Sequence, residues 1–307
     1  MDDGLSVVVP VYNSEATLPL LIQRLQTVLE LSMHPFEVLL VNDGSADASW
    51  TVIQEISSRL AWVRGLDLMR NYGQHNALLA GIRAARYGIT ITLDDDLQNP
   101  PEEIPLLLGK LREGYAAVYG RPRNARHGLW RNLASRISKL VLQRSMGAET
   151  ARQISSFRAF RTNLRKAFED FRGPYVSVDV LLTWGTTHFA VVDVRHDERL
   201  MGQSNYTVGM LIRHAINMTT GFSVWPLRAA SLTGFALTLV GLALLFFVVG
   251  RRLLFGDSVP GFPFLASAIC LFSGAQLFAL GIIGEYLAGL HFRAMDKPPY
   301  AIAKQTG

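Results

Sequence analysis

Two long stretches without a charged side chain constrain this chain more than any other feature of its sequence. They are Ala229–Gly250, with 22 residues, and Ser258–Gly284, with 27. Each exceeds the ~20 apolar residues that a helix needs to cross a bilayer. Outside them the charged fraction rises from 18% to about 21%, close to that of an ordinary globular domain. The sequence therefore predicts a globular unit followed by two transmembrane helices, at about 228–250 and 260–284.

Charges beside the two apolar stretches predict how such a membrane part is oriented. Five basic residues flank the outer ends and two lie between the stretches, namely Arg213, Arg228, Arg293, Lys297 and Lys304 against Arg251 and Arg252. This excess favours both outer ends on the cytoplasmic side. The acidic start Met1-Asp2-Asp3 is unlike a signal peptide, which agrees with a cytoplasmic globular unit. Cys270 is the only cysteine, which excludes an intrachain disulfide and a Cys/His zinc cage.

The first part of the chain alternates strand-like and helix-like patterns. Apolar runs without polar alternation predict strands at Leu5–Val11, Phe36–Val41, Val63–Leu68, Ile89–Leu93 and 115–120, and the segments between them, together with 99–113, have helical periodicity. Residues 175–195 are expected to add a helix and a strand. Alternating elements of these lengths predict an α/β domain with a mostly parallel sheet. Strands that are apolar on both faces indicate a sheet covered by helices on both sides.

A basic block follows this pattern and points to an anionic partner. Residues 114–167 contain twelve basic side chains and one acid, Glu149. The block predicts contact with nucleic acid, an anionic lipid or a phosphorylated substrate, or else forms a solvated helix face. Within it, 130–141 has the periodicity of a basic amphipathic helix, which either lies on a membrane or packs on its own domain. A second amphipathic segment, 207–226, ends in Trp225-Pro226 just before the first apolar stretch.

The acidic cluster Asp94-Asp95-Asp96 is the strongest chemical signal. It falls at the end of a predicted strand, where α/β sheets place their binding sites. Three adjacent carboxylates repel one another unless a cation neutralises them, and oxygen ligands favour Mg²⁺ or Mn²⁺ shared with a substrate phosphate. The two-residue period of an extended strand end predicts Asp94, Asp96 and Gln98 on one side as ligands, with Asp95 opposite. The alternative is an acidic turn that caps the helix near Glu102.

A second polar turn, Asn42-Asp43-Gly44-Ser45, ends another predicted strand at the same edge of the sheet. Its carboxylate could accept hydrogen bonds from a base or ribose, although Asp-Gly is also a common turn. No strand is followed by Gly-x-Gly-x-x-Gly, and no Gly-Lys-Ser/Thr loop occurs. Dinucleotide-dependent dehydrogenases and P-loop nucleotidases are therefore disfavoured. A diphosphate bound without such loops needs a metal and arginines.

Taken together, the ordered motifs resemble the polyprenyl-phosphate glycosyltransferases, inverting enzymes of the GT-A fold and family 2 type. The motifs are the Ser6–Asn13 strand end, the Asn42–Ser45 turn, Arg70–His75, Leu93–Pro105, Arg199–Tyr206 and the ending Gly284-Glu285-Tyr286. The group is similar to dolichol-phosphate mannose synthase and to bacterial undecaprenyl-phosphate aminoarabinose and glucose transferases. Two positions depart from its pattern: Asp95, where alanine is more usual, and Asn205, where lysine is more usual.

The resemblance implies roles for a set of residues. Catalytic contacts are implied for Asp96, Arg199 and Ser204, and metal binding for Asp94, Asp96 and Gln98. The residues implied to contact the nucleotide sugar are Pro10, Tyr12, Glu15, Asp43, Arg70 and Asp95. Those implied to contact the acceptor phosphate are Arg121, Arg123, Ser155 and Arg158. For each arginine the alternative is an ordinary surface charge.

The implied reaction moves a sugar from a UDP-sugar to a polyprenyl phosphate such as undecaprenyl phosphate, with Mg²⁺ or Mn²⁺. The acceptor phosphate is already anionic near neutral pH, so it needs positioning more than deprotonation. The product would be a lipid-linked monosaccharide for an envelope glycan or for lipid A modification. A processive polysaccharide synthase is the rival enzyme, but it usually has a Gln-x-x-Arg-Trp signature and more spans. A membrane scaffold that only binds nucleotide sugars is the non-enzymatic rival.

The expected organisation follows from these assignments. We expect a cytoplasmic GT-A domain at 1–206, a juxtamembrane segment at 207–226, and a membrane domain with a cytoplasmic tail at 227–307. The resemblance places the chain in the bacterial inner membrane as a multi-pass protein and suggests a homo-oligomer, by analogy a tetramer. Membrane lipids and a phosphorylated lipid replace nucleic acid as the expected partners of the basic block. The sugar stays open between 4-formamido-arabinose, glucose and others.

Overall fold

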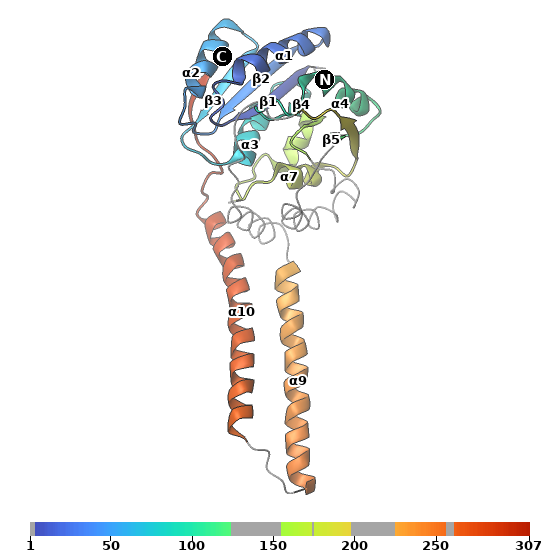
Figure 1. The fold of residues 1–307 in the computed structure, drawn as a ribbon, viewed down its shortest axis with the longest axis vertical. Coiled ribbons are helices and arrows are strands. Elements are labelled where there is room, and N and C mark those ends of the chain that lie inside the picture. Colours follow the sequence, from blue (N-terminus) through green and yellow to red (C-terminus); the bar gives the residue numbers. More distant parts are fainter. Residues whose placement is uncertain (1–3, 124–154, 174, 198–224, 256–260) are drawn as a thin grey trace. The chain divides into compact units, whose positions relative to one another are not determined.

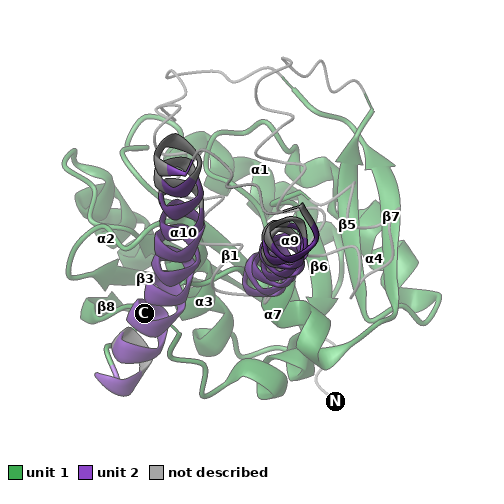
Figure 2. Cartoon of the chain, turned by 90° about the horizontal axis from the view of Figure 1, so that it is seen from below, with its two compact units in different colours: residues 1–215, 297–307 green, residues 216–296 purple. Residues whose placement is uncertain are grey.

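The computed structural model describes residues 4–123, 155–173, 175–197, 225–255 and 261–307 (Figure 1). The chain divides into two compact units, residues 1–215 with 297–307, and residues 216–296 (Figure 2). The predicted amphipathic segment 130–141 and residues 207–224 of the second one lie outside the described residues, as do Arg199 and Ser204.

The first unit is an α/β domain built on one eight-stranded sheet of order β7-β5-β6-β4-β1-β2-β3-β8. Its strands are β1 (Leu5–Val11), β2 (Phe36–Asn42), β3 (Val63–Leu68), β4 (Ile89–Thr92), β5 (Ala117–Pro122), β6 (Arg158–Arg161), β7 (Phe189–Val194) and β8 (Ile302–Thr306). Its helices are α1 (Leu18–Leu31), α2 (Ser49–Arg59), α3 (Gln74–Ala84), η1 (Pro101–Glu103), α4 (Ile104–Arg112), η2 (Thr162–Phe168) and α7 (Val178–Gly185). β6 and β8 run antiparallel to their neighbours and the remaining pairs are parallel. The predicted mostly parallel α/β sheet is therefore confirmed.

Helices cover both faces of the sheet, as the apolar strands predicted. Every residue of β1 is buried. Val7 and Val9 belong to the core that α1 and α4 close, whereas Val8 faces α3 on the other side. Gly81 lets α3 approach closely there, because a Cβ on it would lie 2.3 Å from Val8 Cγ1. Helices thus pack on both faces of the sheet, which leaves the loops at the strand ends as the place for a binding site.

The neighbouring strands β1 and β4 separate at their carboxyl ends. Their last pair is Val8 with Thr92, and β1 continues to Val11 beside β2 alone. Along a parallel strand the backbone polar groups of successive residues point to alternate sides. Val11 O accepts from Asp43 N on the β2 side, so the backbone N and O of Pro10, one residue earlier, point to the β4 side. Proline has no backbone N–H, but no hydrogen bond of the sheet is lost here, because β4 no longer pairs with β1 at Pro10. This is the switch point of the sheet, where open α/β folds bind ligands.

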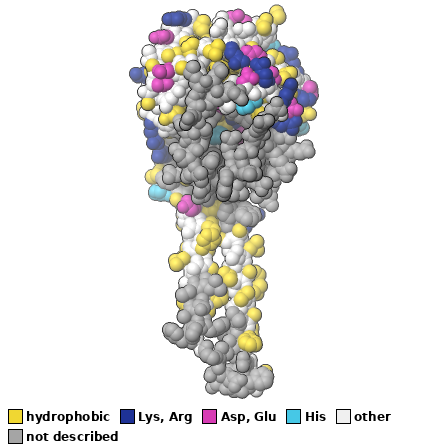
Figure 3. All heavy atoms as spheres, in the orientation of Figure 1, with side chains coloured by type: hydrophobic (Ala, Val, Ile, Leu, Met, Phe, Trp, Pro, Cys, Tyr) yellow, Lys and Arg dark blue, Asp and Glu magenta, His cyan; other side chains and the backbone are white. Residues whose placement is uncertain are grey.

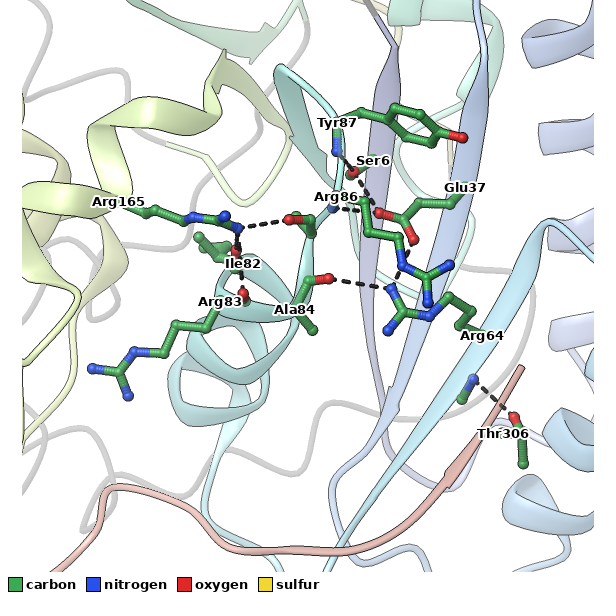
Figure 4. A network of polar contacts seen from close by, with 12 residues as sticks. Ser6, Glu37, Arg64, Ile82, Arg83, Ala84, Arg86, Tyr87, Arg165 and Thr306 are labelled. Carbon is green, nitrogen blue, oxygen red and sulfur yellow. Dashed lines mark hydrogen bonds and ion pairs between the residues drawn. The ribbon is translucent and has the colours of Figure 1, made fainter. Parts of the chain in front are cut away.

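A buried polar network holds the opposite edge of the sheet together (Figure 4). Glu37 is 3% exposed and accepts hydrogen bonds from Ser6 Oγ at 2.7 Å and Arg86 N at 2.6 Å. Its second oxygen accepts from Arg64 Nη1 at 2.8 Å. Arg165 Nη1 donates to carbonyls at the end of α3, the shortest being Ala85 O at 2.6 Å. One carboxylate thus links β1, β2, β3 and the segment after α3.

The last residues of the chain return to the sheet as β8. β8 pairs antiparallel with β3, and Thr306 Oγ1 accepts from Gly65 N at 2.9 Å. Residues 297–307 therefore belong with the globular unit, whereas the sequence analysis placed them with the membrane part as a tail. The five residues of β8 include two polar side chains and a lysine, and the strand with which they pair lies about 240 positions earlier, so no local pattern marked it.

The second unit contains two long helices, α9 (Trp225–Phe255) and α10 (Phe262–Ala294). Hydrophobic side chains line their described parts (Figure 3), with Phe246 73% exposed and Leu277 69% exposed. Among the described residues one segment, Phe272–His291, is long and apolar enough to cross a membrane. The apolar part of α9, Leu227–Ala243, is shorter. The structure thus supports one of the two predicted transmembrane helices.

Replacing Glu37 by alanine is expected to lower the free energy of unfolding by about 3–5 kcal/mol, because Arg64 then keeps a buried charge without its partner. The measurement is the unfolding of the full chain in detergent, followed by tryptophan fluorescence. Glu113→Ala is the matched control, since Glu113 is 55% exposed and pairs with Lys110 at the surface. We expect no change in its unfolding midpoint. An equal loss in both variants would contradict the role assigned to the network.

Candidate functional site

Asp94 opens the acidic loop that follows β4, and both of its oxygens are held. Oδ1 accepts from Gln74 Nε2 at 2.6 Å, and Oδ2 accepts from the hydroxyl of Ser156. Loss of contact with water raises the pKa of this carboxyl to about 6, against the lowering effect of the Ser156 hydroxyl, and the neighbouring charges of Asp96 and Asp95 raise it further. A carboxylate of this kind gains from a nearby cation.

Asp95 joins the ends of β1 and β4. Its Oδ2 accepts from Tyr12 N at 3.1 Å and from the hydroxyl of Ser14. Burial raises the pKa of Asp95, and the hydrogen bond from Ser14 opposes that shift. The residue therefore spans the switch point of the sheet. Its hydrogen-bond partners differ from those of Asp94.

The rest of the acidic loop is a turn and not the extended strand end that the prediction assumed. Asp96 Oδ1 accepts from Gln98 N at 3.1 Å, two residues on. Leu97 lies between them with a φ of 61° and is 1% exposed. This left-handed conformation is uncommon outside glycine, asparagine and aspartate, and such backbone strain often marks functional sites. The grouping of Asp96 and Gln98 thus comes from a local turn.

The carboxylates of the described residues offer a small set of oxygen ligands for a metal. No three His, Cys, Asp or Glu side chains converge within the described part of the chain. One or two carboxylates together with substrate phosphates are the usual ligands of Mg²⁺, and oxygen donors suit Mn²⁺ equally. The acidic loop fits a cation that shares its coordination with a substrate.

Asp43 is buried at the end of β2 and holds the turn before α3. It is 3% exposed, and its two oxygens accept from Tyr72 N at 2.7 Å and Gly73 N at 2.8 Å. Burial raises the pKa of Asp43, and these two backbone hydrogen bonds oppose that shift. Gly44 beside it has a φ of 65°, and a Cβ there would lie 2.4 Å from Asn71 N. In this arrangement Asp43 shapes the turn from which Gln74 reaches Asp94.

The loop after β1 is fastened to the loop after β2. Ala46 N donates to Asn13 Oδ1 at 2.8 Å, and Ala48 N donates to Glu15 Oε2 at 2.8 Å at the start of α2. Of the residues predicted to line a nucleotide site, Pro10 is buried, and Tyr12 is 46% exposed. Arg70 lies over the ring of Tyr72, with its guanidinium carbon 4.6 Å from the ring centroid. Tyr12, Glu15 and Arg70 are therefore the exposed members of this group, whereas Pro10 and Asp43 are buried.

Arg121 and Ser155, two of the residues predicted to bind an acceptor phosphate, gather at the end of β5. Arg121 is 44% exposed at its side chain and pairs with Asp193 on β7. The Ser155 hydroxyl donates to Gly120 O at 2.6 Å and to Phe157 O at 3.0 Å. Arg123 Nη2 lies 3.4 Å from Asp193 O. The two arginines are accessible to a ligand at this edge.

Arg158 has a different place from the one that the motifs implied. It is 1% exposed, its guanidinium pairs with Asp179 on α7, and its Nε donates to Thr92 Oγ1 at 2.9 Å. A direct contact between Arg158 and an acceptor phosphate does not fit this buried position. Arg158 instead supplies positive charge beneath Asp94, where it opposes the rise in the pKa of that carboxyl.

The segment after β7 ends against the acidic loop. Asp197 N donates to Gln98 O at 2.9 Å, and Arg195 N donates to Glu103 Oε2 at 3.1 Å. Arg199 and Ser204, two of the three predicted catalytic residues, follow outside the described residues. Asp197 therefore lies beside Gln98, one of the predicted metal ligands.

Three residues that received no role from the motifs make direct contacts in the site. Ser14 and Ser156 donate to the acidic loop, and Gln74 reaches it from α3. Gln74 belongs to the Arg70–His75 motif, and Ser156 lies between Ser155 and Arg158, for which the resemblance implied a role. A serine or glutamine has no spacing rule that marks it as a partner of a carboxylate 62 or 20 positions away.

Comparison with known proteins gives both a family and a fold. Residues 6–171 match the family described as glycosyl transferase family 2. The chain is 36% identical to the undecaprenyl-phosphate 4-deoxy-4-formamido-L-arabinose transferase of Pseudomonas paraeruginosa, over 98% of this chain and 90% of that one. The protein of the same name from Shewanella sediminis is 35% identical, over 98% and 92%.

Among solved structures, the fold is similar to that of glucosyl-3-phosphoglycerate synthase from Mycobacterium tuberculosis, in complex with Mn²⁺, uridine diphosphate and phosphoglyceric acid. The TM-score is 0.54, with 20% identity over 71% of this chain and 77% of that one. At this identity the likeness concerns the fold.

In the absence of divalent cations, the chain is expected to become more stable as the pH falls from 7 to 5. Folded Asp94 takes up a proton near pH 6, whereas the unfolded carboxyl does so near 3.8, so the folded state binds more protons in this window. Asp94→Asn removes this gain. The measurement is the unfolding midpoint of both proteins in EDTA at several pH values. Parallel pH profiles of the two proteins would contradict the expectation.

Proposed function

This chain belongs to glycosyl transferase family 2, and we propose that it transfers a sugar from a UDP-sugar to a polyprenyl phosphate, such as undecaprenyl phosphate, with inversion at the anomeric carbon. The observation that carries the proposal is the acidic loop at the switch point of the sheet, in a chain that matches undecaprenyl-phosphate transferases over 98% of its length. The relatives confirm the predicted resemblance to polyprenyl-phosphate glycosyltransferases.

Asp94 and Asp96, with Gln98, are the proposed ligands of Mg²⁺ or Mn²⁺. The raised pKa of Asp94 supports this assignment, because its causes, burial first and then the charges of Asp96 and Asp95, all disfavour the ionised carboxylate, which a bound cation would stabilise. The glucosyl-3-phosphoglycerate synthase with a similar fold, whose structure contains Mn²⁺ and uridine diphosphate, also supports it. When bound, the ion would neutralise the charge that develops on the departing diphosphate. Asp96 is proposed to act catalytically through this role.

The nucleotide part of the donor is proposed to lie along the ends of β1 and β2. Tyr12 offers an exposed ring there, and Pro10 faces the β4 side of the switch point. Asp43 and Glu15 are proposed to contribute mainly by holding the turns that shape this edge, since their carboxylates accept from backbone N–H groups. Arg70 is available beside them for a negatively charged or planar group.

The acceptor phosphate is proposed to lie between the end of β5 and the acidic loop. It needs no general base, because a phosphate monoester is largely ionised at neutral pH. Arg121 and Arg123 supply accessible positive charge at this edge. Arg199 and Ser204, which lie outside the described residues, are proposed from the sequence motifs to complete the site. An acceptor aligned behind the anomeric carbon displaces the diphosphate directly.

The pairing of β8 with β3 supports a membrane part that crosses the bilayer twice. β7 and β8 lie in one sheet, so the chain between them must begin and end on the same side of a membrane. An even number of crossings follows. The apolar segment Phe272–His291 supplies one, and α9 is the other long helix of the described residues outside the sheet domain. We propose a hairpin of two spans that keeps the domain at the cytoplasmic face of a bacterial inner membrane.

Asp96→Ala is expected to reduce metal-dependent transfer by at least ~100-fold, because it removes a metal ligand that acts on the leaving group. The assay supplies undecaprenyl phosphate, Mn²⁺ and a panel of radiolabelled UDP-sugars to the full chain in detergent, and the lipid product is identified by mass. Glu113→Ala, a surface change away from the acidic loop, is the control and should retain activity.

The product distinguishes the proposal from its rivals. A lipid-linked monosaccharide supports it and names the sugar. A long polymer would indicate a processive synthase, and nucleotide-sugar binding without any product would indicate a scaffold. Full activity of Asp96→Ala would remove the metal assignment.

A further inference from the structure

Ser156 stands out among the residues around Asp94, because neither the motifs nor the proposed mechanism gives it a role. Its hydroxyl donates to Asp94 Oδ2 from the segment just before β6, 62 positions along the chain. Both residues are half-buried. The neighbouring Ser155 turns its hydroxyl to two backbone carbonyls instead. Two adjacent serines therefore have separate tasks, and one of them acts on a proposed metal ligand.

The position of Ser156 is itself fixed by β4, the strand that leads to Asp94. Ser156 O accepts from Thr92 Oγ1 at 2.7 Å, and Thr92 Oγ1 in turn accepts from Arg158 Nε at 2.9 Å. Thr92 pairs with Arg158 across β4 and β6. Ser156 is therefore joined to the end of β4 at two points, through its carbonyl to Thr92 and through its hydroxyl to Asp94.

Buried charge stabilises this link from below. Arg158 is 1% exposed, and its guanidinium pairs with Asp179, which also accepts from the Tyr119 hydroxyl at 3.1 Å. Moving Arg158 or Asp179 away from its partner would leave an unpaired charge in the interior of the domain, which costs much free energy. The buried ion pair and its hydrogen bonds therefore hold the surrounding backbone in one arrangement. The start of β6 is thus a stiff support for the Ser156 hydroxyl.

The second oxygen of Asp94 has a weaker support. Gln74 Nε2 donates to Oδ1 at 2.6 Å, but Gln74 is exposed at the start of α3. A long exposed side chain loses more conformational freedom when it is held in one position. Each carboxylate oxygen has a further lone pair after accepting these bonds. The two donors thus orient Asp94 and leave it able to bind a cation.

We propose that Ser156 is a positioning residue that orients the Asp94 carboxylate for the divalent cation. The proposal rests on the metal site of the proposed function and deepens it. Hydrogen-bond partners of metal ligands commonly contribute about 10–100-fold to metal affinity, because they hold the ligand in its binding orientation. Ser156 contributes here without touching metal or substrate itself.

The test is Mn²⁺ binding to the full chain in detergent with UDP present, measured from the electron paramagnetic resonance signal of free Mn²⁺. Ser156→Ala is expected to raise the Kd for Mn²⁺ about 10-fold or more. Ser155→Ala, the same change one residue earlier, should leave that Kd unchanged. Ser156→Thr keeps the hydroxyl and should restore most of the affinity. Equal melting temperatures without metal show that the variants are folded.

Each outcome decides a separate point. Wild-type affinity in Ser156→Ala, with binding lost in Asp94→Asn, overturns the positioning role and leaves the metal site in place. Equal weakening by both alanine variants also overturns it, because the effect would then belong to the segment. Undiminished binding in Asp94→Asn would overturn the metal assignment itself. If Ser156→Ala does not fold, Gln74→Ala tests the same orientation from the other oxygen and should weaken binding by a smaller factor, and unchanged affinity there contradicts the proposal.

Discussion

The parting of β1 from β4 is the constraint on which the rest of the site depends. Beyond the Val8–Thr92 pair the two strands lead to separate loops, and the polar residues of both loops face the same edge. Asp95 is the group that joins them, through Tyr12 N and the Ser14 hydroxyl. Asp95 is also one of the two positions, with Asn205, at which the motifs depart from the pattern of the group that the sequence resembles. A carboxylate there adds a link that alanine lacks, and it adds negative charge beside the proposed metal ligands.

That added charge makes the electrostatic balance of the loop depend on its surroundings. Asp94, Asp95 and Asp96 are consecutive, and the pKa values of the first two are raised. Burial is the main cause of both shifts; hydrogen bonds from hydroxyl and backbone donors oppose it, and the charge of buried Arg158 opposes it at Asp94 by a smaller amount. What remains is a site that a divalent cation and an anionic diphosphate would complete together. Among the described residues near the site, buried Arg158 supports the loop, whereas Arg121 and Arg123 stay accessible at the end of β5.

The C-terminal strand connects the architecture of the sheet to the proposed membrane part. An edge strand contributed from the end of the chain keeps that end beside β3, through the β8 ladder and the Gly65–Thr306 hydrogen bond. Hydropathy alone marks one segment of the described residues as able to cross a bilayer. Strand pairing adds an independent argument, because a sheet cannot be divided between the two sides of a membrane.

The strands β1 to β5 with the helices between them, the acidic loop and the family could be predicted from the sequence, because they depend on local periodicity and on motifs of neighbouring residues, whereas the strands β6 and β8 were not predicted. The apolar run of β1 and the polar turn at Asp43 are examples. Only the tertiary structure decided that Arg158 is buried in an ion pair with Asp179, and that Ser156 and not Ser155 donates a hydrogen bond to Asp94. It also decided that Ile302–Thr306 adds an edge strand to the sheet. These contacts join residues 21, 62 and about 240 positions apart, and packing of the whole domain, which no local pattern encodes, brings them together.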